Sequence, residues 1–159
     1  MLIETGRPFY LAILAIVIGL GTIIGYQEYQ KSQNKNFIII FTSAGEVKIK
    51  VEYAETPEKQ EKGLMGRASL NSNSGMLFIF PEEKRRQFWM SETLIPLDAL
   101  FIDSSGRINE ITTLQPCSET SACPIYNSHE PARYTIEVNA GFAAKNRIAE
   151  GDILEISGF

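Results

Sequence analysis

The chain has 159 residues, and its 19 aspartate and glutamate residues outnumber its 15 lysine and arginine residues to give a net charge of −4. Because no basic cluster alternates with aromatic residues, this composition argues against a nucleic-acid partner. The part of the chain after residue 36 is long enough for one domain with a hydrophobic core and too short for two.

The first predicted element is an apolar segment at residues 9–26, which contains no charged side chain. As a helix it would be roughly 27 Å long, close to the ~30 Å hydrocarbon core of a lipid bilayer. Tyr10 and Tyr26 lie near its ends, where amphipathic rings favour the headgroup region. A cleaved signal peptide is the alternative, but its apolar region is usually shorter and is followed by a small-residue cleavage site. We therefore expect a signal anchor that crosses the membrane once.

Polar flanks surround this segment, with residues 1–8 before it and a linker at residues 27–36 after it. Their charges are too evenly balanced for the positive-inside rule to fix an orientation. A short N-terminal flank followed by a large C-terminal domain is the usual arrangement of an exported protein. We expect the domain at residues 37–159 to lie outside the cytoplasm, periplasmic or extracellular, with the lipid bilayer as the partner of the anchor.

Most of the domain shows strand patterns. From Val47 to Val51, apolar and charged side chains alternate with the period of a strand that is buried on one face. Residues 103–106 (DSSG) predict a hairpin turn, capped by Asp103 and with a positive φ at its glycine. Such short strands between turn residues predict a mainly β domain, a sandwich or a barrel. Other strands are predicted by apolar or aromatic runs at residues 37–42, 76–80, 87–90 and 97–102, by Ile108 and Ile111, by the alternation of Tyr134, Ile136 and Val138, and by the apolar residues of 153–156.

Two short helices are expected between the strands. The first begins after Thr56, an oxygen-bearing cap followed by proline, and Gly66 is expected to end it. The second is expected to start at Asn139 and to end at Asn146, because asparagine tolerates the left-handed conformation of a helix stop.

The only two cysteines, Cys117 and Cys123, have three interpretations. The first is a structural disulfide, which an exported domain permits and which would stabilise the fold by about 2 kcal/mol. The second is a redox pair, although the spacing differs from Cys-x-x-Cys. The third is a copper site in which both thiolates join His129 and Met90. We expect the disulfide, which would fix a long loop at residues 115–131 that has no predicted secondary structure.

Residues 87–90 (QFWM) contain a candidate ligand platform. If Phe88 and Met90 point inward in a strand, then Gln87 and Trp89 face solvent or a cleft. The alternative is that Trp89 packs in the core or at its rim. An exposed tryptophan on a sheet face would offer a large flat surface to a ligand.

Three polar residues complete the set of ligand-binding candidates, which is Trp89, Asp98, Arg133 and His129. Asp98 lies in an apolar strand pattern, so its carboxylate is exposed, paired with Arg133, or available in a cleft as an acid or base. His129 is the only histidine and lies in the cysteine loop, where no nucleophile motif accompanies it.

Six sequence blocks occur in order along the domain: GLMGR (residues 63–67), GMLFIF (75–80), FWMSETLIPLDALFID (88–103), QPCSETSACPIY (115–126), PARYTIEVNAG (131–141) and GDILEI (151–156). They resemble the family known as domain of unknown function 192, an uncharacterised group of bacterial and archaeal proteins. The resemblance implies one β-rich, jelly-roll-like domain outside the cytoplasm, and many members carry a signal peptide or an anchor. It implies no activity. This chain has Asn146 where the family pattern has glycine.

These observations favour a membrane-anchored, exported β domain that binds a small ligand or an envelope protein, without catalysis and without a cofactor. Two alternatives stay open. One is an envelope hydrolase that uses Asp98 and Glu137 as paired carboxylates. The other is a copper or redox accessory protein that uses the two cysteines with His129 and Met90.

Overall fold

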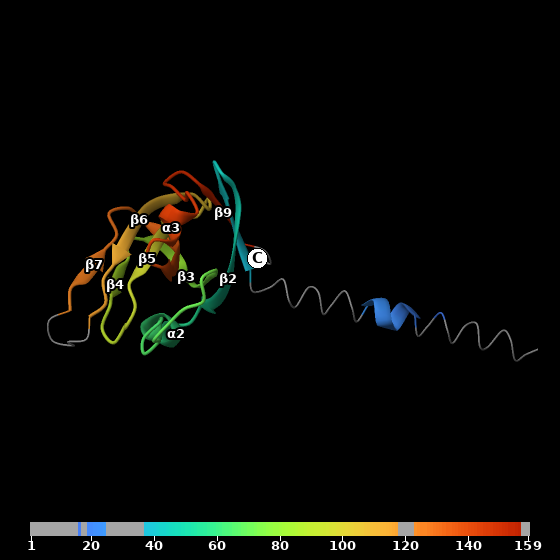
Figure 1. Cartoon of the computed structure of the whole chain (residues 1–159), viewed down its shortest axis with the longest axis horizontal. Coiled ribbons are helices and arrows are strands. Elements are labelled where there is room, and N and C mark those ends of the chain that lie inside the picture. Colours follow the sequence, from blue (N-terminus) through green and yellow to red (C-terminus); the bar gives the residue numbers. More distant parts are fainter. Residues whose placement is uncertain (1–15, 17–18, 25–36, 118–122, 157–159) are drawn as a thin grey trace, which may run out of the picture. The chain divides into compact units, whose positions relative to one another are not determined.

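The computed structural model describes residues 16, 19–24, 37–117 and 123–156 (Figure 1). The chain divides into two compact units, Met1–Lys35 and Asn36–Phe159. In the first unit, residues 16 and 19–24 are helical. Among the described residues, no helix has both the length and the apolar character needed to cross a membrane. Most of the segment at residues 9–26 and the whole linker at residues 27–36 fall outside the described residues, so the membrane anchor stays a prediction.

Strands make up most of the second unit, which confirms the prediction of a mainly β domain. Their bounds are β1 (Phe37–Thr42), β2 (Gly45–Ala54), β3 (Ser74–Lys84), β4 (Gln87–Trp89), β5 (Leu97–Ile102), β6 (Ile108–Leu114), β7 (Ile125–Asn127), β8 (Ala132–Asn139) and β9 (Ile153–Ile156). The two described helices of this unit are α2 (Pro57–Lys62) and α3 (Phe142–Lys145).

Seven of the strands form one curled sheet in the order β6-β5-β8-β3-β2-β1-β9. A bridge between Arg107 and Ile153 joins the chain before β6 to β9, so the two edges of the sheet meet at one point. The result is a half-barrel, in place of the two facing sheets of a jelly roll. β4 and β7 form a separate antiparallel ribbon, at the end of the domain away from β2 and β9 (Figure 1).

One parallel pair in this sheet explains the position of α2. β2 and β3 run parallel, whereas the other neighbouring strands are antiparallel. Parallel strands cannot be joined by a tight hairpin, so the chain between them must cross over the sheet. α2 lies on this crossover, and the Gln60 side-chain amide fixes it by donating hydrogen bonds to the carbonyl oxygens of Ala54 and Ile79 at 3.1 and 2.8 Å.

Both faces of the sheet are buried, because successive residues of a strand point to opposite sides. On one face, Leu77, Leu100 and Ile136 pack in a cluster with residues of β1, β2 and α3. On the other face, Phe78 and Phe101 pack in a second cluster with residues of β4 and the segment after α2. All six residues of β5 are therefore buried.

Three local expectations differ from the structure. α2 ends at Lys62 and is capped by Gly63, one turn before the expected stop at Gly66. α3 begins only at Phe142, and the left-handed residue after it is Arg147 (φ 55°) instead of Asn146. The loop at residues 115–131 contains β7, which the sequence does not reveal because only three residues pair with β4.

Candidate functional site

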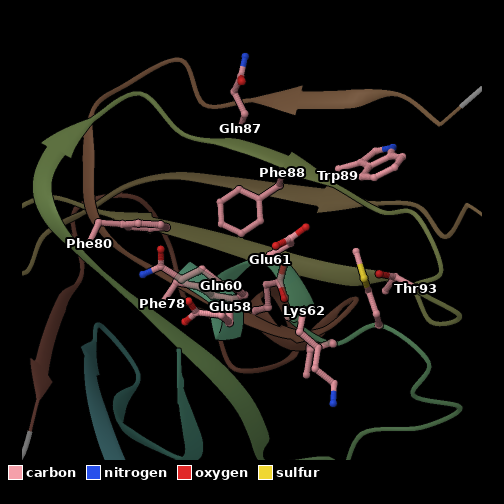
Figure 2. A pocket seen from close by; sticks show the side chains of 14 residues that line it. Glu58, Gln60, Glu61, Lys62, Phe78, Phe80, Gln87, Phe88, Trp89 and Thr93 are labelled. Atoms are coloured by element: carbon pink, nitrogen blue, oxygen red, sulfur yellow. The ribbon is translucent and has the colours of Figure 1, made fainter. Parts of the chain in front are cut away.

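A cleft of about 620 Å³ lies between α2 and β4 (Figure 2). We call it the α2–β4 cleft. Its lining combines aromatic and aliphatic side chains with charged and polar ones. The apolar lining residues are Leu64, Met65, Phe78, Phe80, Phe88 and Trp89, and the others are Glu58, Gln60, Glu61, Lys62, Gly63, Gln87, Thr93 and Glu137.

β4 provides the aromatic wall of this cleft. Phe88 is 9% exposed and packs edge-to-face against Phe78 and Phe101, with ring centroids 5.3 and 5.6 Å apart. Trp89 is 48% exposed, lies at the rim beside Phe88 in Figure 2, and pairs across the ribbon with Ile125. Of the two interpretations of QFWM, the structure shows the one with Phe88 inward and Trp89 outward.

α2 provides the acidic wall. Figure 2 shows the side chains of Glu58 and Glu61 on this helix, across the cleft from Phe88. Hydrogen bonds from its own backbone N–H and from the Thr56 side chain lower the pKa of Glu58, which keeps this carboxyl ionised. Thr56 also accepts a hydrogen bond from the Lys59 N–H at 3.4 Å, which confirms it as the helix cap.

Glu137 on β8 is the buried titratable group of the cleft. It is 5% exposed and pairs with Met76 on β3 and with Ala99 on β5. β3 lies so close that a Cβ on Gly75 would be 2.5 Å from the Glu137 carbonyl oxygen. Burial raises the pKa of the Glu137 carboxyl to about 8. The carboxyl is therefore mostly protonated and uncharged at neutral pH.

Asp98 lies on the other face of the sheet and holds α3 in place. Its carboxylate accepts hydrogen bonds from the Thr113 hydroxyl at 2.8 Å and from the Ala143 N–H at 3.1 Å. Pairing with Arg133 is wrong, because Asp98 lies opposite Val138, at the other end of β8. The acid–base pair of Asp98 and Glu137 is also wrong, since Glu137 lies opposite Ala99 and so points to the opposite face.

His129 and Arg133 also lie outside the residues that line the α2–β4 cleft. The His129 side chain is 87% exposed, and its Nδ1 lies 3.0 Å from Oε1 of Glu110. The His129 N–H donates to the other oxygen of Glu110 at 2.7 Å. Burial raises the pKa of Glu110, but hydrogen bonds from His129 and Thr112 outweigh it, so the net pKa is lowered. Of the four ligand-binding candidates, only Trp89 contributes to the cleft.

Known proteins share the sequence pattern of this domain. The model of the family DUF192 (domain of unknown function 192), described as "Uncharacterized ACR", matches residues 39–156. The chain belongs to the DUF192 family. A UPF0127 protein of Pyrococcus abyssi is 31% identical over 111 residues, which are 67% of this chain and 85% of that protein.

Two solved structures resemble this DUF192 chain. A putative transcription regulator from Sinorhizobium meliloti is 38% identical with a TM-score of 0.69, over 75% of this chain and 91% of that one. A protein of unknown function from Novosphingobium aromaticivorans is 32% identical with a TM-score of 0.69, over 75% of this chain and 83% of that one. The family match and these two structures support the fold described above.

A disulfide joins Cys117 to Cys123 in this DUF192 domain, with Cα atoms 5.7 Å apart, which confirms the predicted bond. Cys117 also bridges to Ser91 and Thr93, so the cysteine loop is tied to the segment after β4. The thiolate copper site is wrong, because both sulfur atoms are used in the bond and Met90 is buried in the core. In the described part of the chain, no three His, Cys, Asp or Glu residues are grouped so that they could hold a metal ion.

Proposed function

We propose that this chain is a membrane-anchored, extracytoplasmic DUF192 domain that binds a small ligand in the α2–β4 cleft without catalysing a reaction. The observation that carries the proposal is the exposed indole of Trp89 at the rim of a cleft of about 620 Å³. Ligand sites usually have volumes of roughly 300–1,000 Å³ and mainly apolar linings with a few polar groups. The cleft fits both criteria.

Its aromatic lining is already ordered for binding. Phe88 is held by Phe78 and Phe101, and the backbone of its neighbour Trp89 is held by the pairing of β4 with β7. A rigid aromatic surface binds an apolar group with little loss of side-chain entropy. The described lining residues include no serine, cysteine or histidine, the most frequent nucleophiles and bases of enzymes. These features favour binding over catalysis.

The location outside the cytoplasm is supported by two features of the sequence and the fold. Residues 9–26 carry no charge and have the length of a membrane span. The bond between Cys117 and Cys123 is typical of an oxidising compartment. A ligand of this domain would therefore be a molecule of the cell envelope or its surroundings.

Binding in the cleft can be tested with the full-length protein and a panel of small aromatic and aliphatic fragments. We expect some fragments to bind saturably and to shift the NMR signals of Lys62, Phe88 and Trp89. Trp89→Ala should weaken their binding about tenfold or more, because exposed aromatic anchors dominate binding energy. Phe41→Ala is the matched control, because this exposed aromatic side chain lies on β1, outside the cleft. Binding that survives Trp89→Ala, or no saturable binding by any fragment, would contradict the proposal.

A further inference from the structure

We propose that the α2–β4 cleft is specific for a ligand with a cationic group, an ammonium or a guanidinium, that binds the Glu137 carboxylate while an apolar body contacts Phe88 and Trp89. This inference rests on the proposed function of the cleft and adds the chemical class of its ligand.

The first argument is that the Glu137 carboxyl lacks a partner. No described residue forms a hydrogen bond or an ion pair with it, although the residue is 5% exposed. Buried polar groups are nearly always hydrogen-bonded in folded proteins. The fully enclosed side-chain atoms without a partner, among the described residues, are Asn109 Oδ1 and Thr135 Oγ1. The Glu137 carboxyl is not one of them, so it keeps access to the cleft and can be reached by a ligand.

The second argument is the charge around this carboxyl. The charged side chains that line the cleft with it, Glu58, Glu61 and Lys62, all belong to α2. The lining residues of β3 and β4 are uncharged, and the partners of Glu137 on the neighbouring strands are Met76 and Ala99. The cleft is thus lined by the carboxyl groups of three glutamates and by one amine, that of Lys62. A cation is complementary to this arrangement, whereas an anion would be repelled.

The third argument is the aromatic wall opposite α2. Aromatic ring faces attract ammonium and guanidinium groups, and this attraction is larger where water is excluded. Phe88 and Trp89 can therefore contact both the apolar body of the ligand and the side of its cationic group. Carboxylates together with aromatic rings distinguish this cleft from a purely apolar pocket.

Binding of a cation changes the protonation of Glu137. The free carboxyl is mostly protonated at neutral pH, since burial raises its pKa to about 8. A cation binds the ionised form, so the O–H bond of the carboxyl breaks and its proton passes to solvent while the ligand keeps its own protons. The affinity should therefore rise about tenfold per pH unit as the pH approaches 8, and level off above it. A ligand that accepts a hydrogen bond from the protonated carboxyl would show the opposite trend.

Three probes that share a phenylethyl body test this inference on the full-length protein: 2-phenylethylammonium, 2-phenylethanol and 3-phenylpropanoate. NMR titrations at pH 8 should show that the ammonium binds about tenfold tighter than the alcohol, the size of one charged hydrogen bond, and that the carboxylate binds weakest. The affinity of the ammonium should rise between pH 6 and pH 8.

The outcomes separate this inference from the proposed function. Equal binding of the ammonium and the alcohol, both dependent on Trp89, would overturn the cationic specificity and leave the cleft as a binding site. Preference for the carboxylate, or the absence of binding by all three probes, would also overturn it.

A pair of variants identifies the group responsible. Glu137→Gln should make the affinities for the ammonium and the alcohol equal and remove the pH dependence. Glu155→Gln, an exposed carboxyl on β9, should leave both unchanged. A preference for the ammonium that survives Glu137→Gln would show that another group, such as Glu58 or Glu61, is responsible and would overturn the role of Glu137.

Discussion

Glu137→Gln is expected to stabilise the folded protein by about 3 kcal/mol at pH 7 and by about 5 kcal/mol at pH 9. Burial raises the pKa of this carboxyl from 4.5 to about 8. Between these values the unfolded chain has released a proton that the folded chain keeps, so stability falls by about 1.4 kcal/mol per pH unit as the pH rises. The amide resembles the protonated acid in shape and does not ionise, so the variant escapes this loss.

Denaturant unfolding at pH 4, 7 and 9 measures this effect. The variant and the natural protein should differ little at pH 4, where both the folded and the unfolded carboxyl are largely protonated, and diverge as the pH rises. Glu155→Gln serves as the control, since its side chain is exposed on β9. Parallel pH profiles for the natural protein and Glu137→Gln would contradict the assignment of a buried, uncharged carboxyl.

Phe88→Ala is expected to destabilise the fold by about 3–5 kcal/mol, the usual cost of removing a buried aromatic ring. Phe88 packs between Phe78 and Phe101, so its loss would leave a cavity in the cluster under the cleft. Trp89→Ala, the neighbouring substitution, should cost about 1 kcal/mol or less, because its side chain is half exposed. Denaturant unfolding of both variants at pH 5 gives the comparison.

The contrast between these neighbours tests how β4 is oriented. The structure requires a large loss of stability for Phe88→Ala and a small loss for Trp89→Ala. Trp89→Ala should therefore stay folded and still weaken ligand binding. Similar losses of stability in both variants would mean that Trp89 belongs to the core, and would remove the main support for the cleft as a ligand site.

Glu137 lowers the stability of the fold and also lines the α2–β4 cleft, and this combination indicates a role in binding. Glu137 costs several kcal/mol at neutral pH on the linkage argument above, and a glutamine or an apolar residue of similar size would avoid this cost. Proteins tolerate such costs most often where activity needs a strained or unfavourable group. The proposed cationic ligand provides the partner that the carboxyl lacks.

The sequence offers the outward orientation of Trp89 as one of two interpretations, and it does not reveal the environment of Glu137. QFWM alternates clearly between apolar and polar or amphipathic residues, so the inward Phe88 identifies the outward Trp89. Residues 134–138 also alternate, and this pattern puts Glu137 on the face opposite Ile136 and Val138 without showing what covers that face. The structure buries it, because the crossover carrying α2 and the ribbon of β4 and β7 cover that face of the sheet.

The role of Asp98 could not be read from its neighbours in sequence. Its partners, Thr113 on β6 and the N–H of Ala143 on α3, are brought together only by the folded sheet. The acidic wall of the cleft was missed for the same reason. Glu58 and Glu61 face the cleft because β2 and β3 pair in parallel, and a strand pattern does not show the direction in which a strand pairs.

The most direct test of this account is an NMR titration of the side-chain carboxyl carbons of glutamate in the full-length protein, with and without 2-phenylethylammonium. In the free protein the Glu137 signal should titrate at a pKa of about 8, well apart from the exposed carboxyls, and the ammonium should lower this pKa. A Glu137 signal that titrates at about 4–5 with the surface glutamates, or that does not respond to the ammonium, would contradict the account.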